Sequence, residues 1–292
     1  MDNFKIIFKV FRFHHWIKNI LLFIPLITAH KFHNLDLVLE LCIAFISFSL
    51  CASSIYIFND IIDIDHDRSH PNKKNRPFAS SKISINFGII LGITLLTISF
   101  ILSFGLNELF TIFLFTYLAL SILYSFFLKK VKYLDCIILV GFYVLRIFSG
   151  GAVVNIMPSF WLIIFSFFIF MSLAFVKRYI ELNVHYSENG NSKIAGRGYD
   201  SNDIKKLYFL GITTGYLSVL ILAFYLGSET VARLYNAVIF IWLSIPLLFI
   251  WITFIWKKSK AREIDDDPIV FSIKDKISVT ITFLFFLCFI LA

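Results

Sequence analysis

Long apolar runs separated by short polar segments make up most of the chain. A helix needs about 20 apolar residues to cross the hydrocarbon core of a bilayer, and nine stretches are predicted to do so. They are residues 17–30, 36–58, 84–105, 109–128, 133–154, 160–180, 207–227, 235–256 and 274–292. The first is the weakest, because Lys18 and Asn19 lie near its start and Pro25 in its middle predicts a kink.

The positions of Lys and Arg orient these helices, because loops on the cytoplasmic side of a membrane retain positive charge. With the N-terminus inside, all of the 27 Lys and Arg residues except Lys31, Arg146 and Arg233 belong to the predicted cytoplasmic segments. Adding or removing one span would scramble this distribution. The pattern therefore predicts nine helices with the N-terminus in the cytoplasm and the C-terminus outside.

Composition favours a membrane protein and excludes ordinary soluble domains. Hydrophobic residues make up 59% of the 292 residues and charged residues 16%, which leaves too little polar surface to cover a soluble fold. The four cysteines all lie in apolar stretches without metal-ligand spacing, so neither a zinc site nor a disulfide framework is expected. The net charge of +8 lies beside the spans without a nucleic-acid-binding module, so anionic lipids and phosphate substrates are expected partners and nucleic acid is not.

Two Gly-x-x-x-Gly pairs lie within predicted spans, one at Gly88 and Gly92 and one at Gly211 and Gly215. Small residues at this spacing let two helices approach closely. We expect both pairs to pack helices within one chain, with a dimer contact as the alternative.

The densest group of chemically active side chains follows the second predicted span. Asn59, Asp63 and Asp67 recur every four residues, which places them on one stripe if the helix continues this far, with neighbouring Cβ atoms about 5–6 Å apart. Two carboxylates so placed suit Mg²⁺, which is usually held by one or two carboxylates together with waters and substrate phosphates. The spacing therefore predicts a magnesium site at these three residues.

Three cations, Lys73, Lys74 and Arg76, follow Asp67 in a turn stiffened by prolines on either side. A metal-bound phosphate would meet positive charge there, so the stretch is typical of a diphosphate site. The alternative is a solvated loop whose acids are screened by neighbouring bases; an EF-hand does not fit, because its Gly and its terminal Glu are missing. The residues expected to act in catalysis are Asp63, Asp67, Lys73 and Arg76.

This stretch resembles the first aspartate-rich motif of the UbiA superfamily of intramembrane prenyltransferases. The motif reads N-D-x-x-D-x-x-x-D, and it is matched here by Asn59, Asp60, Asp63 and Asp67. The continuation R-x-H-P-x-K-x-x-R-P at residues 68–77 is similar to the decaprenyl-phosphate phosphoribosyltransferase-like branch of that superfamily.

The resemblance implies a fold class and a location. The expected architecture is all-α, with nine transmembrane helices around a central cavity. Residues 1–292 would form a single integral membrane domain, and the expected location is the bacterial inner membrane. Cytoplasmic loops would cap the active-site face. These loops are residues 59–83, 181–206 and 257–273.

Similarity to the superfamily extends along most of the chain and implies further substrate-binding residues. Arg146 lies within the fifth span, where an isolated guanidinium is costly, so it needs either Asp135 or a substrate phosphate as its partner. For the cations near the cytoplasmic loops, the alternative is plain positive-inside topology. The expected substrate-binding residues are Lys18, Asn59, Asp60, Lys129, Arg146, Lys177, Arg178, Glu181 and Arg197.

One segment departs from the superfamily's pattern. Its prenyltransferases carry a second D-x-x-x-D motif after the sixth helix, where this chain has Lys177 and Glu181, with His185 four residues later. Only one of these three is a carboxylate, so a second metal cluster is not expected. The more cationic segment suits a donor with an additional phosphate, such as phosphoribosyl diphosphate.

The favoured function is therefore a Mg²⁺-dependent transfer of a 5-phosphoribosyl group from phosphoribosyl diphosphate to a polyprenyl phosphate. The acceptor oxygen is already largely ionised, so no strong general base is required. The alternative within the superfamily is a prenyltransferase that moves a polyprenyl group from its diphosphate to an aromatic acceptor. A transporter is disfavoured, because Arg146 is the one basic residue well inside a predicted span.

Overall fold

The computed structural model describes residues 2–69, 73–189, 197–228, 231, 234, 235, 237–264 and 267–292. Within these ranges the regular elements are all helices, so the predicted all-α class is confirmed. Seven of the described helical segments are long and apolar enough to cross a membrane. They are Leu35–Ile62, Ile85–Phe104, Glu108–Phe126, Leu134–Val153, Phe160–Tyr186, Asp203–Leu226 and Val238–Lys260.

The first and last predicted spans differ from the other seven. Residues 17–30 fall in a 3₁₀ helix, η1 (Phe13–Phe23), followed by a short α-helix, α2 (Ile24–Thr28). Pro25 lies in the first turn of α2, where its missing N–H costs nothing, so the predicted kink is a change of helix type. The last span is α14 (Lys276–Ile290), an apolar helix of 15 residues. The count of nine spans stays a prediction.

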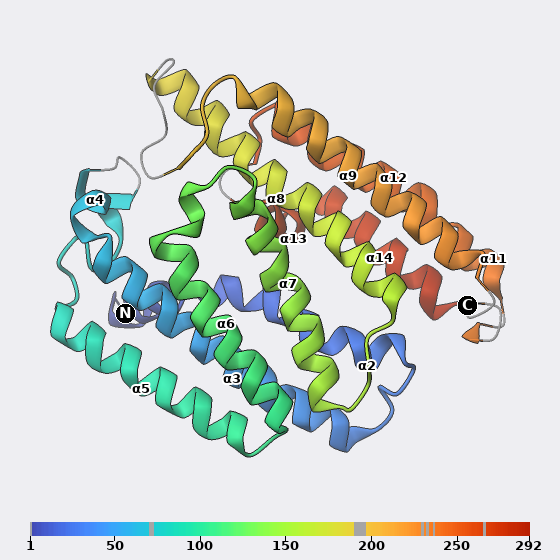
Figure 1. Ribbon diagram of the computed structural model, residues 1–292, viewed down its shortest axis with the longest axis horizontal. Helices are drawn as coiled ribbons and strands as arrows, with labels where there is room; N and C mark the ends of the chain where they lie inside the picture. The colour runs from blue at the N-terminus through green and yellow to red at the C-terminus, as the bar shows by residue number, and fades with distance from the viewer. Residues whose placement is uncertain are drawn as a thin grey trace. The chain divides into compact units, whose positions relative to one another are not determined.

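The helices form two compact units. The first comprises Met1–Phe127 and Leu145–Pro158, and the second comprises Leu128–Val144 and Ser159–Ala292. Besides η1 and α2, the first unit contains α1 (Asp2–Phe11), α3 (Leu35–Ile62), α4 (Ile64–Ser69), η2 (Lys73–Asn75), α5 (Ile85–Phe104), α6 (Glu108–Phe126) and the C-terminal part of α7 (Leu134–Val153) (Figure 1).

The second unit contains the N-terminal part of α7 and, apart from α14, six further described helices. Asp267 caps α13 by accepting hydrogen bonds from the backbone N–H groups of Ile269 and Val270, and such caps satisfy otherwise unpaired donors. The six helices are η3 (Leu128–Lys130), α8 (Phe160–Asn189), α9 (Asp203–Leu226), α11 (Val238–Trp242), α12 (Ser244–Lys260) and α13 (Pro268–Lys274).

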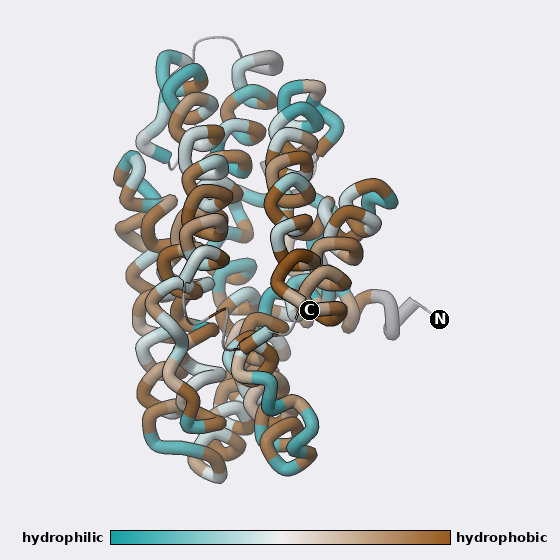
Figure 2. Tube along the Cα trace, turned by 90° about the vertical axis from the view of Figure 1, so that its right-hand side faces the viewer, coloured by the Kyte–Doolittle hydropathy of each residue, from teal (hydrophilic) through white to brown (hydrophobic). Residues whose placement is uncertain are grey.

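Apolar side chains point outwards over much of both units. Phe104, Phe115, Phe209 and Phe224 are each more than 60% exposed although they lie in long apolar helices. Figure 2 shows hydrophobic positions along the helices and hydrophilic positions gathered at helix ends and loops. An exposed apolar surface of this kind requires lipid as its solvent, so the chain is an integral membrane protein.

Small side chains join α3 to α5 in the first unit. The hydroxyls of Ser47 and Ser99 each donate to the other residue's backbone carbonyl, at 2.8 and 2.7 Å. Ser54 donates to the carbonyl of Gly92 at 2.8 Å. A Cβ at Gly92 would lie 2.9 Å from the ring of Phe58, so this glycine packs helices within the chain, as predicted.

The second glycine pair packs the helices of the second unit in the same way. Ser172 on α8 donates to the carbonyl of Gly211 on α9 at 2.7 Å and accepts from the indole N–H of Trp256 on α12 at 3.1 Å. A Cβ at Gly211 would lie 2.1 Å from the Trp256 ring, which is buried.

Replacing Gly211 by Ala is therefore expected to lower the free energy of unfolding by about 1–3 kcal/mol, because the buried indole has to move. Thermal unfolding in detergent measures the effect. The matched control is Gly141→Ala, also within a long helix of this unit, where an added Cβ meets nothing within 4 Å. There the gain in helix propensity predicts no loss of stability, and equal losses in the two variants would contradict the packing argument.

Candidate functional site

The predicted aspartate-rich stripe begins at the end of α3. This helix ends at Ile62, Asp63 is its C-cap, and α4 begins one residue later. Helical hydrogen bonds continue across the break, since the N–H of Asp63 donates to the carbonyl of Asn59 at 2.9 Å and that of Asp67 to the carbonyl of Asp63 at 2.8 Å. The four-residue spacing thus keeps its helical geometry, as the sequence predicted.

Two of the motif's aspartates are buried and paired with arginines. Arg76 bridges them, because its Nη1 lies 3.1 Å from Oδ1 of Asp60 and 2.7 Å from Oδ2 of Asp67. Arg12 donates from Nη2 to the same Oδ1 of Asp60 at 2.6 Å. Asp60 is 5% exposed and Asp67 2%. Buried carboxylates need such compensation. We call this charged group, which consists of Arg12, Asp60, Asp67 and Arg76, the first-unit cluster.

Arg12 was not predicted as a site residue. The positive-inside rule accounts for any basic residue near the N-terminus, so its charge carries no specific signal. Its backbone adopts the left-handed conformation, with φ 50° and ψ 47°, at the junction of α1 and η1. Its guanidinium carbon lies 4.9 Å from the ring centroid of Tyr56 on α3, a distance at which the cation is attracted to the ring face.

The other predicted residues of this unit lie in three places. Asn59 and Asp63 are half-buried at the end of α3, next to the first-unit cluster in sequence. Lys18 is half-buried on η1. Lys73 begins η2, but its side chain lies outside the described residues.

The donor set suits a hard cation. No three His, Cys, Asp or Glu side chains among the described residues are grouped so as to hold a metal by themselves. Mg²⁺ does not need three, because it is usually bound by one or two carboxylates together with substrate phosphates and waters. Asp63 and Asp67, one helical turn apart, fit that requirement, and Asn59 adds an amide oxygen one turn earlier.

Arg146 lies in the core of the first unit among polar and aromatic side chains. Its Nε donates to Oδ1 of Asn19 at 2.8 Å and its Nη2 to the hydroxyl of Tyr117 at 3.3 Å. The guanidinium carbon lies 5.0 Å from the ring centroid of Phe48 and 4.9 Å from that of Tyr117. Asn19 is in turn fixed by donating to Ser49 at 2.8 Å. Arg146 thus ties η1 to α3 and α6.

Pairing of Arg146 with Asp135, one of the two predicted alternatives, is wrong. Both residues lie on α7, eleven positions apart, which is about 16 Å along a helix axis. The carboxylate of Asp135 instead faces Arg178 and Arg197.

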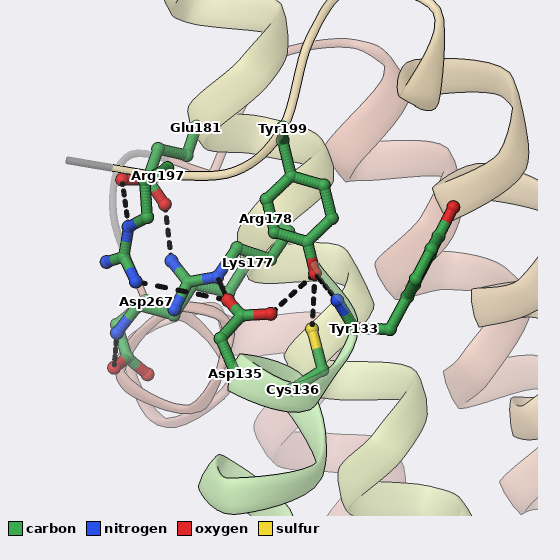
Figure 3. Close-up of polar contacts among 9 residues, drawn as sticks. All are labelled: Tyr133, Asp135, Cys136, Lys177, Arg178, Glu181, Arg197, Tyr199 and Asp267. Carbon is green, nitrogen blue, oxygen red and sulfur yellow. Dashed lines mark hydrogen bonds and ion pairs between the residues drawn. The ribbon is translucent and has the colours of Figure 1, made fainter. Parts of the chain in front are cut away.

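The second unit contains a second charged cluster, drawn in Figure 3. Arg178 on α8 pairs with Asp135 through Nε and with Glu181 through Nη1. Arg197 donates from Nε to Oε1 of Glu181 at 3.4 Å, and its Nη1 lies 3.9 Å from Oδ2 of Asp135. The hydroxyl of Tyr199 donates to Oδ1 of Asp135 at 2.5 Å. We call Asp135, Arg178, Glu181, Arg197 and Tyr199 the second-unit cluster.

Three predicted substrate-binding residues, Arg178, Glu181 and Arg197, are therefore brought together. A fourth, Lys177, extends the cluster by an ion pair of 3.6 Å with Asp267, whereas Lys129 is half-buried on η3. Tyr199 was missed, and no local pattern marks it. Asp135 and Lys132 were not among the predicted site residues either.

Asp135 had a usable signal, since a carboxylate within an apolar span is costly and requires a partner. Lys132 lies outside the span, 2.9 Å from Asp200 and 2.6 Å from Asp203. These two hydrogen bonds raise the pKa of Lys132, because both favour its charged form.

Comparison with known proteins gives a family match. The family model described as the UbiA prenyltransferase family matches residues 20–272. A solved UbiA homologue from Archaeoglobus fulgidus bound to GPP and Mg²⁺ has a similar fold, with a TM-score of 0.68 at 16% identity over 96% of this chain and 98% of that one.

Three relatives are more similar in sequence. Protein y4nM of Sinorhizobium fredii is 33% identical over 96% of this chain, which spans 54% of y4nM and thus about half its length. Nodulation protein NoeC of Azorhizobium caulinodans is 34% identical over 75% of this chain and 71% of its own. The decaprenyl-phosphate phosphoribosyltransferase of Mycolicibacterium smegmatis is 30% identical over 70% of this chain and 66% of its own.

Proposed function

Because the chain belongs to the UbiA prenyltransferase family of membrane transferases, we propose that it moves a 5-phosphoribosyl group from phosphoribosyl diphosphate to a polyprenyl phosphate. One observation carries most of the proposal. Asp60 on α3, Asp67 on α4 and Arg76 after η2 converge in the first-unit cluster, so the motif brings carboxylates and a cation to one place.

The residues of the motif have separate tasks in this proposal. Asp63 and Asp67, with Asn59, would hold Mg²⁺, which supplies neutralisation of the charge that builds on a departing diphosphate. Arg76 would exchange part of its pairing with Asp67 for a phosphate oxygen, for which a guanidinium has suitable geometry. Asp60 and Arg12 would keep Arg76 oriented, since Arg12 and Arg76 both pair with Oδ1 of Asp60. Lys73 is proposed as a second cation for the diphosphate.

The reaction balances without a strong base. An ionised oxygen of the polyprenyl phosphate forms a bond to C1 of the ribose, the bond from C1 to the diphosphate oxygen breaks, and inorganic diphosphate leaves with the electron pair. Positioning and electrostatic stabilisation would supply most of the rate enhancement.

The second-unit cluster supports a phosphorylated sugar donor rather than a second metal. At the place of a second aspartate pair the chain has Lys177 and Glu181, and Arg178 and Arg197 both pair with Glu181. We propose that Lys177, Arg178 and Arg197, with Glu181 as their counter-ion, take part in phosphate binding. The M. smegmatis relative, a decaprenyl-phosphate phosphoribosyltransferase, supports the same donor class.

The proposal includes a place in the cell and two further substrate contacts. We place the protein in the bacterial inner membrane, with its N-terminus and the loops at 59–83, 181–206 and 257–273 in the cytoplasm. The water-soluble donor, phosphoribosyl diphosphate, would bind from that side. Lys18 and Lys129 are proposed to contact substrate phosphates. The contacts of Arg146 with Asn19 and Tyr117 favour a structural role for that residue over substrate binding.

Incubation of the purified protein with Mg²⁺, polyprenyl phosphate and labelled phosphoribosyl diphosphate tests the proposal. We expect label in the lipid fraction and release of diphosphate, both abolished by chelation of Mg²⁺. The second candidate is prenyl transfer from a polyprenyl diphosphate, favoured by the likeness to the fold of the GPP-bound homologue. Consumption of polyprenyl diphosphate without lipid-linked sugar label would replace the first function by the second.

A further inference from the structure

The segment 197–203 is held against the start of α7 by consecutive contacts within the second unit. A Cβ at Gly198 would lie 2.4 Å from the carbonyl oxygen of Lys130, so the close approach there requires glycine. On the same segment, Asp200 and Asp203 both pair with Lys132. The segment therefore has one defined position against residues 130–136.

Tyr199 occupies the centre of this contact. It is 1% exposed, and its hydroxyl accepts a hydrogen bond from the N–H of Tyr133 at 2.7 Å. The same hydroxyl donates to Asp135 and lies 3.6 Å from the sulfur of Cys136. The Tyr133 ring meets the Tyr199 ring edge-on, with centroids 5.9 Å apart. Donor, acceptor and ring contacts together fix the hydroxyl (Figure 3).

Asp135 connects this hydroxyl to the arginines. Its side chain is fully buried, and its two oxygens have different partners. Oδ1 accepts from Tyr199, while Oδ2 faces Nε of Arg178 and Nη1 of Arg197. A hydrogen bond that fixes one carboxylate oxygen also fixes the orientation of the other. The Tyr199 hydroxyl thus helps to set the orientation in which Asp135 meets both guanidinium groups, which Glu181 contacts as well.

We infer that Tyr199 and Asp135 are positioning residues that hold Arg178 and Arg197 in the geometry that binds a phosphate group. Tyr199 acts twice, because it orients Asp135 and because it fixes the segment that carries Arg197 two positions earlier. The inference rests on the proposed phosphate-binding role of the second-unit cluster. It adds Tyr199, which the sequence did not predict, and it gives Asp135 a role other than the predicted pairing with Arg146; neither residue is proposed to contact the substrate itself.

Tyr199→Phe removes one oxygen and keeps the ring, so it tests the positioning role. The probe is inorganic phosphate, added to the purified protein while its thermal unfolding is followed. We expect the variant to need about tenfold more phosphate than wild type for half-maximal stabilisation, since loss of a hydrogen bond to a buried carboxylate disturbs both arginines. In the transfer assay, KM for phosphoribosyl diphosphate should rise more than kcat falls.

The matched control is Tyr216→Phe. The Tyr216 hydroxyl is hydrogen-bonded to that of Thr253 at 3.0 Å, between α9 and α12 of the same unit, so the same atom is removed from another hydrogen bond. A purely structural role predicts equal phosphate dependence in the two variants, and that result would overturn the inference, as would a wild-type protein that phosphate does not stabilise. Absence of sugar transfer by wild type, with the phosphate difference intact, would overturn only the proposed reaction.

Discussion

Replacing Asp63 by Asn is expected to reduce Mg²⁺-dependent transfer by about 10³-fold or more. The amide is nearly isosteric with the carboxylate but neutral, so a metal held by Asp63 and Asp67 would lose half of its protein charge and with it the stabilisation of the leaving diphosphate. Initial rates of labelled lipid formation across a Mg²⁺ titration measure the effect. We expect a lower maximal rate and a higher Mg²⁺ concentration at half-maximal rate.

Asp65→Asn is the matched control. Asp65 lies two residues away on α4, its side chain is fully exposed, and its 3.7 Å pairing is with the partly exposed Arg68. The substitution makes the same change in net charge and composition, yet an exposed pair contributes little, so activity should stay close to that of wild type. Retained Mg²⁺-dependent turnover in Asp63→Asn would exclude this carboxylate as a metal ligand. Equal loss in both variants would indicate a general effect of charge.

Local patterns predicted the parts of the structure that depend on local interactions. Apolar runs of sufficient length gave the seven long helical segments, from Leu35–Ile62 to Val238–Lys260, because in lipid each helix satisfies its own backbone hydrogen bonds. The stripe of Asn59, Asp63 and Asp67 was predicted for the same reason, since hydrogen bonds between residues four apart continue from α3 into α4. Pro25 predicted a kink, and the helix is irregular there, but the form of the irregularity, a switch from 3₁₀ to α-helix, was not predicted.

Contacts between distant residues could not be predicted from spacing. Arg12 and Asp60 are 48 positions apart, and Tyr199 and Asp135 are 64 apart. Nothing in the neighbouring sequence distinguishes Arg12 from other N-terminal cations or Tyr199 from other tyrosines. The pairing of Arg146 with Asp135, one of two predicted alternatives, was wrong for a different reason, because eleven residues of one helix already separate them by about 16 Å.

The charge of the second unit also differs from its sequence appearance. Lys177, Arg178 and Arg197 made that half of the chain look strongly cationic, but each has a carboxylate partner in Asp267, Asp135 or Glu181. Buried or half-buried cations need counter-ions, and those counter-ions came from other parts of the chain. The phosphate binding that we propose there would consequently depend on how the arginines are oriented rather than on excess charge.

Replacing Arg178 by Met is expected to lower the free energy of unfolding by about 3–5 kcal/mol, because it leaves a buried carboxylate without its principal cation. Arg178 is 2% exposed and Asp135 fully buried, so water cannot take over the missing contact. Methionine retains most of the aliphatic volume, which separates the loss of charge from the loss of packing. Thermal unfolding in detergent at one fixed scan rate gives the comparison with wild type.

The exposed pair of Lys258 and Glu263 provides the control. Their side chains are 25% and 52% exposed, so Lys258→Met should cost less than about 1 kcal/mol. The double variant Asp135→Asn, Arg178→Met removes both buried charges and should regain part of the stability lost in Arg178→Met alone, because the unpaired carboxylate is gone while Tyr199 still has an acceptor. A double variant less stable than Arg178→Met would show that Asp135 stabilises the fold independently of Arg178, through Tyr199 and Arg197.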